Sequence, residues 1–130
     1  MENSICLDTD IIAGLLRNKP EVVRWFKDNT DKELVTTSVS LFELYHGAYK
    51  SNSSEKNLAA IDKLINRIKI IDFSRKAALE AGKQYARLEK EGNIIEFRDM
   101  FIGCIALVEG FSLKTNNKSH FSRIEGLKIL

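Results

Sequence analysis

The sequence predicts an α/β fold in which a short, mostly parallel sheet is flanked by helices. Short apolar or β-branched segments alternate along the chain with longer amphipathic segments, which is the pattern of strand–helix–strand units. The first segment, Ile5–Leu7, is a continuous apolar run, as expected of a strand buried on both faces. We expect residues 1–130 to form a single domain, because 44% hydrophobic residues are enough to fill one core.

Composition and charge exclude several classes of protein. Charged residues make up 29% of the chain and the net charge is only +2, so neither disorder nor a strongly basic nucleic-acid surface is indicated. Cys6 and Cys104 lie in apolar runs without a CxxC spacing, which favours a buried, reduced pair. No secretory signal is visible, and the longest apolar run, 100–108, is far shorter than the ~20 residues that span a bilayer. We therefore expect a cytoplasmic protein with no membrane partner.

The first part of the chain is predicted to hold two strands and three helices. After the first strand, Ile11–Arg17 is apolar and compatible with a helix, and Pro20 suits the first turn of a second helix over Glu21–Lys27. Leu34–Thr37 is short and β-branched, which indicates the second strand. Ser38 is a favourable N-cap for the helix that follows. One face of that helix is apolar and consists of Leu41, Leu44, Tyr45 and Ala48.

Serine caps and a glycine define the middle of the chain. The run Ser51–Ser54 ends one helix and begins another, and Ile70–Ile71 indicates a brief third strand. Ser74 is expected to cap the next helix and Gly92 to end it. The apolar face of the helix before the third strand consists of Leu58, Ile61, Leu64, Ile65 and Ile68.

The last part of the chain is expected to contain a buried helix and two further strands. Asp99 should open a helix that is apolar nearly all round and that Gly110 ends. The segment 111–115 is predicted to be the fourth strand, and 127–130 is predicted to be an edge strand.

Acidic residues recur at the ends of the predicted strands. Asp8 follows the first strand, Glu43 lies on the helix after the second, and Asp99 begins the buried helix before the fourth. Each has an ordinary alternative role, because Asp caps helices and a single Glu on a helix is usually solvated. The carboxyl ends of parallel strands meet at one edge of a sheet, however, and ligands bind in the crevice there. We therefore expect these carboxylates to converge.

Three converging carboxylates without a balancing Arg or Lys would repel one another strongly in a crevice of low dielectric constant. A bound divalent cation removes that repulsion, and ligation by oxygen alone favours Mg²⁺ or Mn²⁺ over zinc. Such a cation lowers the pKa of bound water and stabilises the charge of a reacting phosphodiester. The pattern therefore predicts metal-dependent nuclease chemistry.

Four motifs occur in the order in which they occur in a known family. They are Leu7–Thr9, Ser38–Leu44 followed by Gly47, Asp99 with Ile102 and Ala106 in its helix, and Thr115–Asn117 ahead of Phe121. Through them the whole chain resembles PIN domains, in particular the ribonuclease toxins of VapBC toxin–antitoxin pairs. The resemblance implies a three-layer PIN fold and an endoribonuclease that hydrolyses phosphodiester bonds in RNA such as tRNA or rRNA. It also implies that Asp8, Glu43 and Asp99 are catalytic and bind Mg²⁺ or Mn²⁺.

The resemblance further implies a homodimer and a cognate antitoxin protein whose tail lies in the active-site groove. We expect the dimer to form through the apolar face of Leu41, Leu44, Tyr45 and Ala48, or through that of Leu58, Ile61 and Ile65, because several amphipathic helices offer more apolar surface than one small domain covers.

The chain departs from many members of this family at one position. They carry a fourth acidic residue after the last strand, where this chain has Asn116, Asn117 and His120. Either Glu96 supplies the missing carboxylate, or the site uses three acids with the amide oxygens of Asn116 or Asn117, next to Thr115. We favour the second, because Glu96 is close to Arg98 in the sequence and can pair with it.

Three other functions are compatible with some of these features. One is a PIN-like RNA-binding module with weak or lost nuclease activity. A receiver or phosphatase domain also gathers acidic residues beyond parallel strands, but Asp72 is the sole candidate phosphoacceptor after the third strand. A DNA-directed flap nuclease of related fold would need additional chain to grip a duplex.

Overall fold

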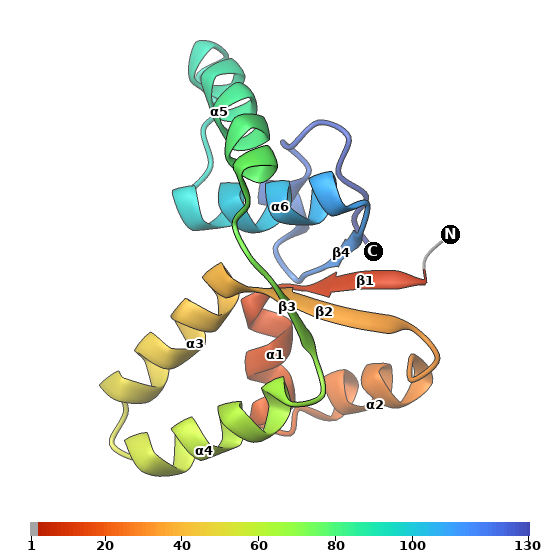
Figure 1. Cartoon of the computed structure of the whole chain (residues 1–130), viewed down its shortest axis with the longest axis vertical. Helices are drawn as coiled ribbons and strands as arrows, with labels where there is room; N and C mark the ends of the chain where they lie inside the picture. Colours follow the sequence, from red (N-terminus) through yellow and green to blue (C-terminus); the bar gives the residue numbers. More distant parts are fainter. Residues whose placement is uncertain (1–2) are drawn as a thin grey trace.

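A computed structural model describes residues 3–130 and shows a four-stranded parallel sheet between two layers of helices (Figure 1). The strands are β1 (Ser4–Leu7), β2 (Glu33–Thr37), β3 (Lys69–Ile71) and β4 (Ser112–Lys114). Their order in the sheet is β3-β2-β1-β4, and every neighbouring pair is parallel. The predicted three-layer α/β fold is therefore confirmed.

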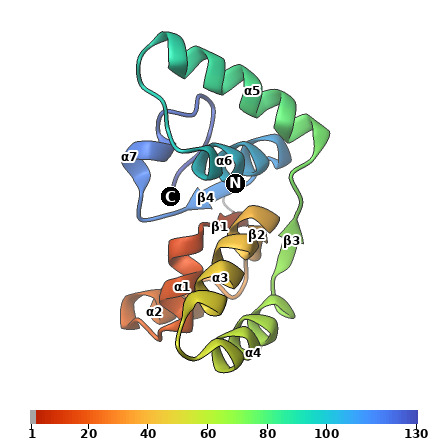
Figure 2. The ribbon, with the colours of Figure 1, turned by 90° about the vertical axis from the view of Figure 1, so that its left-hand side faces the viewer.

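Seven helices within the described residues cover the two faces of the sheet. They are α1 (Thr9–Leu16), α2 (Pro20–Asp28), α3 (Ser38–Lys50), α4 (Ser54–Ile65), α5 (Arg75–Lys90), α6 (Phe97–Glu109) and α7 (Lys118–Phe121). Helices α1–α4 lie on one side of the sheet, and α5, α6 and the C-terminal segment lie on the other (Figure 2). No helix among residues 3–130 is both long and apolar enough to cross a membrane.

Strand β1 contributes to both hydrophobic cores. Ile5 and Leu7 belong to the core beneath α1–α4, whereas Cys6 belongs to the core beneath α5 and α6. This alternation follows from the two-residue period of a strand, and all three residues are at most 1% exposed. Burial raises the pKa of both free cysteines, Cys6 and Cys104, to about 12, so their thiols stay protonated and inert.

Helices α3 and α6 are capped by residues other than the ones predicted. The N-cap of α3 is Thr37 rather than Ser38, because the Thr37 hydroxyl accepts a hydrogen bond from the Ser40 N–H at 3.0 Å. Helix α6 begins at Phe97 rather than at Asp99, because the Glu96 carboxylate caps it and accepts from the Arg98 N–H. Asp99 consequently lies within the first turn of α6.

The prediction of an edge strand over 127–130 is wrong, and one short helix was not predicted. The segment 127–130 is not a strand, because only Leu113 of the short strand β4 pairs with it, through a single parallel bridge to Ile129. The residues after Asn117 form the short helix α7, which has too few residues to show an apolar period in the sequence. Phe121 ends α7 and is fully buried against the α6 side of the core.

Candidate active site

Asp8 lies where the ends of β1 and β4 meet. It follows β1 directly and is the N-cap of α1, so one carboxylate oxygen accepts from the Thr9 N–H at 2.7 Å. The other oxygen accepts from the Thr115 hydroxyl, also at 2.7 Å. The Thr115 oxygen in turn accepts from the Asn117 N–H. Only 6% of Asp8 is exposed, and these donors hold its carboxylate in one orientation.

Glu43 connects α3 to the beginnings of two other helices. Its Oε1 atom accepts from the Thr9 hydroxyl at 2.7 Å, which ties it to the first residue of α1. Its Oε2 atom lies 3.8 Å from Nη1 of Arg98, in the first turn of α6. Glu43 also lines a groove between α1, α3 and α4, which agrees with the expectation that it faces a crevice.

Asp99 is half-buried in the first turn of α6 and faces α7. Its Oδ2 atom lies 3.8 Å from Nδ1 of His120. The same nitrogen of His120 is 2.8 Å from the side-chain amide of Asn117. Asp99 therefore lies at the carboxyl end of β4, between the residues around Asp8 and the short helix α7.

The three predicted acids influence one another electrostatically. The pKa of Asp8 is raised from 3.8 to about 7, mainly by burial. The hydrogen bonds from Thr115 and Thr9 oppose this rise, and the charges of Asp10 and Asp99 contribute to it. The pKa of Asp99 is also raised, mainly by burial and then by the charges of Glu96 and Glu43. Negative charge is thus concentrated at this edge of the sheet.

A positive charge lies beside this cluster, contrary to the expectation that no Arg or Lys would balance it. Arg98 contacts Glu43, and its Nε atom lies 2.8 Å from Oε1 of Glu96. The reason is the earlier start of α6, which places Arg98 in the first helical turn and turns its side chain towards α3.

The residues considered as sources of a fourth ligand differ in their surroundings. Glu96 caps α6 and binds Arg98 through both the backbone N–H and the side chain. The Asn117 amide contacts His120, and Asn116 is exposed. The Asn116 N–H donates to Asp10, a residue that the sequence reasoning did not include in the site. Its position two residues after Asp8 was the available signal.

The donor set consists of carboxylate and hydroxyl oxygens, but it does not surround one point. Within residues 3–130, no group of three or more His, Cys, Asp or Glu side chains is arranged to hold a metal ion. The three acids are therefore gathered at one edge of the sheet without forming a closed coordination site. The fold and site together define a three-layer parallel α/β domain with acidic side chains gathered at the carboxyl ends of its strands.

Comparisons with known proteins identify the family. The PIN domain family matches residues 5–127, and the chain belongs to it. Ribonuclease VapC2 of Haemophilus influenzae is 36% identical over 123 residues, which cover 94% of this chain and 92% of that protein. The tRNA(fMet)-specific endonuclease VapC of Salmonella typhimurium is 36% identical over 124 residues, 95% of this chain and 93% of that protein. These identities place the chain among the VapC members of the family.

Solved structures agree with this assignment. VapBC2 from Rickettsia felis, bound to a DNA fragment from its promoter, has a TM-score of 0.91 at 29% identity and covers 98% of this chain and 97% of that chain. DNA-bound VapBC from Salmonella typhimurium has a TM-score of 0.90 at 34% identity and covers 98% of this chain and 96% of that chain. The receiver-domain alternative is set aside by this family membership.

The raised pKa of Asp8 has a consequence for stability. Between its usual value of 3.8 and about 7, the folded protein retains a proton that the unfolded chain releases, so stability falls as the pH rises through that window. Asp8→Asn removes the charge and keeps an oxygen for the Thr9 N–H. We expect the variant, in EDTA, to be more stable than the parent at pH 8, by roughly a few kcal/mol, and to show no such advantage at pH 4.

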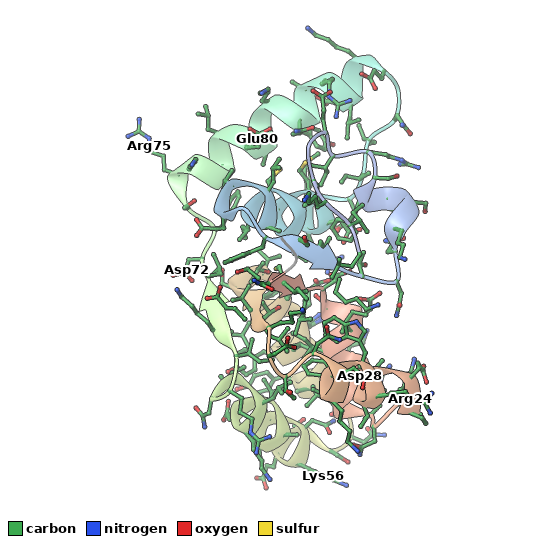
Figure 3. The ribbon with its side chains drawn as sticks, turned by 90° about the vertical axis from the view of Figure 1, so that its right-hand side faces the viewer. Arg24, Asp28, Lys56, Asp72, Arg75 and Glu80 are labelled. Atoms are coloured by element: carbon green, nitrogen blue, oxygen red, sulfur yellow. The ribbon has the colours of Figure 1, made fainter. Side chains whose placement is uncertain are left out.

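Urea unfolding at both pH values measures this difference. Asp28→Asn is the matched control, because Asp28 is exposed at the end of α2, on the outside of the molecule (Figure 3). A variant that is less stable than the parent at pH 8 would show that burial of Asp8 is fully compensated by its hydrogen bonds.

Proposed function

We propose that this protein is a Mg²⁺- or Mn²⁺-dependent endoribonuclease that acts as the toxin of a toxin–antitoxin pair, working as one domain in the cytoplasm. The observation that carries the proposal is the convergence of Asp8, Glu43 and Asp99 at one edge of the sheet, through contacts to Thr115, Thr9 and His120. Family membership supports it, because VapC relatives with 36% identity are named as ribonucleases.

The donor chemistry fits a hard divalent cation. The available ligands are carboxylate oxygens, and burial and mutual repulsion raise the pKa of Asp8 and Asp99. Within residues 3–130, a buried oxygen of Asp10 also has no hydrogen-bond partner. Because these side chains do not yet enclose an ion, we propose that binding involves reorientation of the more exposed ones, Glu43 and Asp99. Their side chains are 23% and 21% exposed, which leaves room for that movement.

In the proposed mechanism, Asp8, Glu43 and Asp99 would hold the cation. A bound Mg²⁺ or Mn²⁺ supplies an activated water and neutralises charge on the phosphodiester. The hydroxyls of Thr9 and Thr115 orient the carboxylates through their hydrogen bonds. Arg98 is half-exposed beside Glu43, so its guanidinium can donate to phosphate oxygens of RNA.

An antitoxin is the proposed protein partner, since the structural neighbours include VapBC complexes. A groove of about 450 Å³ runs between α1, α3 and α4. Glu43 and Arg17 give it charged groups, whereas Leu44, Ala48 and Ile61 line it with apolar surface. We propose that the antitoxin tail occupies this groove and thereby covers Glu43.

A homodimer is also proposed, but through a different surface from the one predicted. The predicted faces are largely used inside the chain, because Leu44, Ala48 and Ile61 are at most 8% exposed. In contrast, α5 and α6 present aromatic side chains around a hollow of about 310 Å³. The members of this aromatic face are Phe73, Tyr85, Phe97 and Phe101, of which Phe73 and Phe97 are exposed by 38% and 57%.

Neutralising single acids tests the nuclease function. Asp8→Asn, Glu43→Gln and Asp99→Asn should each lower the rate of Mg²⁺-dependent RNA cleavage by about 100-fold or more, because each removes one charged ligand. Asp28→Asn should cleave normally. Gel-based cleavage of total RNA by purified protein measures the effect. If the parent protein binds RNA without cleaving it, the alternative of an RNA-binding module is favoured.

A charge placed on the aromatic face tests the dimer. Phe97→Glu should convert the dimer to a monomer, because the carboxylate would have to be buried between two apolar surfaces. Tyr49→Glu, on the exposed side of α3, is the control and should remain a dimer. Light scattering coupled to size-exclusion chromatography distinguishes the two states. A Phe97→Glu dimer would place the interface elsewhere.

A further inference from the structure

Asp10 carries an unusual carboxylate oxygen. Among residues 3–130, its Oδ1 atom is the one buried side-chain nitrogen or oxygen without a hydrogen-bond partner. The other oxygen, Oδ2, accepts from the Asn116 N–H at 3.0 Å. A buried, unpaired acceptor loses its hydration without compensation, and the cost is larger when the acceptor is charged. A bound ligand would explain such an atom, because the ligand would occupy the place of the missing hydrogen-bond partner.

The position of Asp10 connects this oxygen to the acidic side chains gathered at the carboxyl ends of the strands. Asp10 lies in the first turn of α1, two residues after Asp8, and its charge contributes to the raised pKa of Asp8. The bond to Asn116 holds its carboxylate at the end of β4. Asp8 is bonded to the neighbouring residue there, Thr115. The two carboxylates are therefore held at the same strand end by two consecutive residues.

The other candidate residues near these carboxylates are either engaged by a cation or uncharged. Glu96 is the N-cap of α6 and is bonded to Arg98 through both oxygens. Asn117 is neutral, and its amide contacts His120. Asp10 is thus the residue whose charged oxygen is both buried and without a donor.

We propose that Asp10 is a fourth carboxylate of the divalent-cation site, an inference that rests on the proposed function. A water could donate to Oδ1, but it would leave two carboxylates, Asp8 and Asp10, charged beside each other. A divalent cation satisfies the oxygen and offsets both charges. The Asn116 N–H donates to Oδ2 of Asp10 and so fixes the orientation of the carboxylate whose Oδ1 would bind the cation.

Calorimetric titration with Mn²⁺ in the absence of RNA tests this assignment. Asp10→Asn keeps an oxygen for the Asn116 N–H and should raise the Kd for Mn²⁺ about tenfold or more. Glu96→Gln should leave the Kd within about twofold of the parent value, because Glu96 is engaged elsewhere. Asp10→Ser is a second variant with a smaller side chain and should weaken Mn²⁺ binding in the same way. Circular dichroism and thermal melting in EDTA show whether each variant is folded.

The outcomes separate this proposal from the function on which it rests. If Asp8→Asn loses Mn²⁺ binding while Asp10→Asn and Asp10→Ser retain the parent Kd, Asp10 is not a ligand and the proposed nuclease site stands. If the parent protein itself does not bind Mn²⁺, the metal-dependent function fails as well. If Asp10→Asn lowers stability in EDTA and leaves the Kd unchanged, a buried water is the partner of Oδ1 and the proposal is overturned.

Discussion

The hydrogen bond between the Asp8 carboxylate and the Thr115 hydroxyl is the contact on which the arrangement of the site depends. It joins residues 107 positions apart in the sequence and fixes the end of β1 to the end of β4. A carboxylate this deeply buried needs hydrogen-bond donors. Replacing a residue that donates to it would therefore leave an oxygen of Asp8 unpaired. The Thr9 hydroxyl then extends the connection to Glu43, and the β4–α7 segment extends it to Asp99 through His120.

The same contact network carries an electrostatic cost. Asp8 is buried near the charges of Asp10 and Asp99, and Arg98 compensates only the Glu43 side of the cluster. The fold accommodates this because β1 is anchored in two hydrophobic cores, one on each face of the sheet. Functional sites commonly retain such unfavourable charge, since a ligand that binds there recovers the energy. We interpret the clustered carboxylates of Asp8, Glu43 and Asp99 as a site of this kind.

Strands, helix caps and helix ends that depend on a few neighbouring residues could be predicted from the sequence. The apolar run before Asp8, the serine cap of α5 and the glycine after α6 each depend on a few neighbouring residues, and all three are confirmed. The start of α6 was not predictable, because either Glu96 or Asp99 can cap a helix, and the choice places Arg98 in the site. The position of Asp10 two residues after Asp8 was a weak signal, and its tertiary contact with Asn116 could not be deduced from the sequence. The dimer interface could not be deduced from the apolar faces of α3 and α4, because amphipathicity does not reveal whether a face packs inside the chain or against a second copy.

We infer that the carboxylates at the ends of β1 and β4 share a divalent cation. A crystal structure of the protein grown with Mn²⁺, with anomalous diffraction data collected at the manganese edge, tests this directly. We predict an anomalous peak within bonding distance of Asp8, together with a Glu43 side chain released from Arg98. A structure without such a peak at saturating Mn²⁺, or with manganese only on exposed carboxylates such as Glu55, would contradict it.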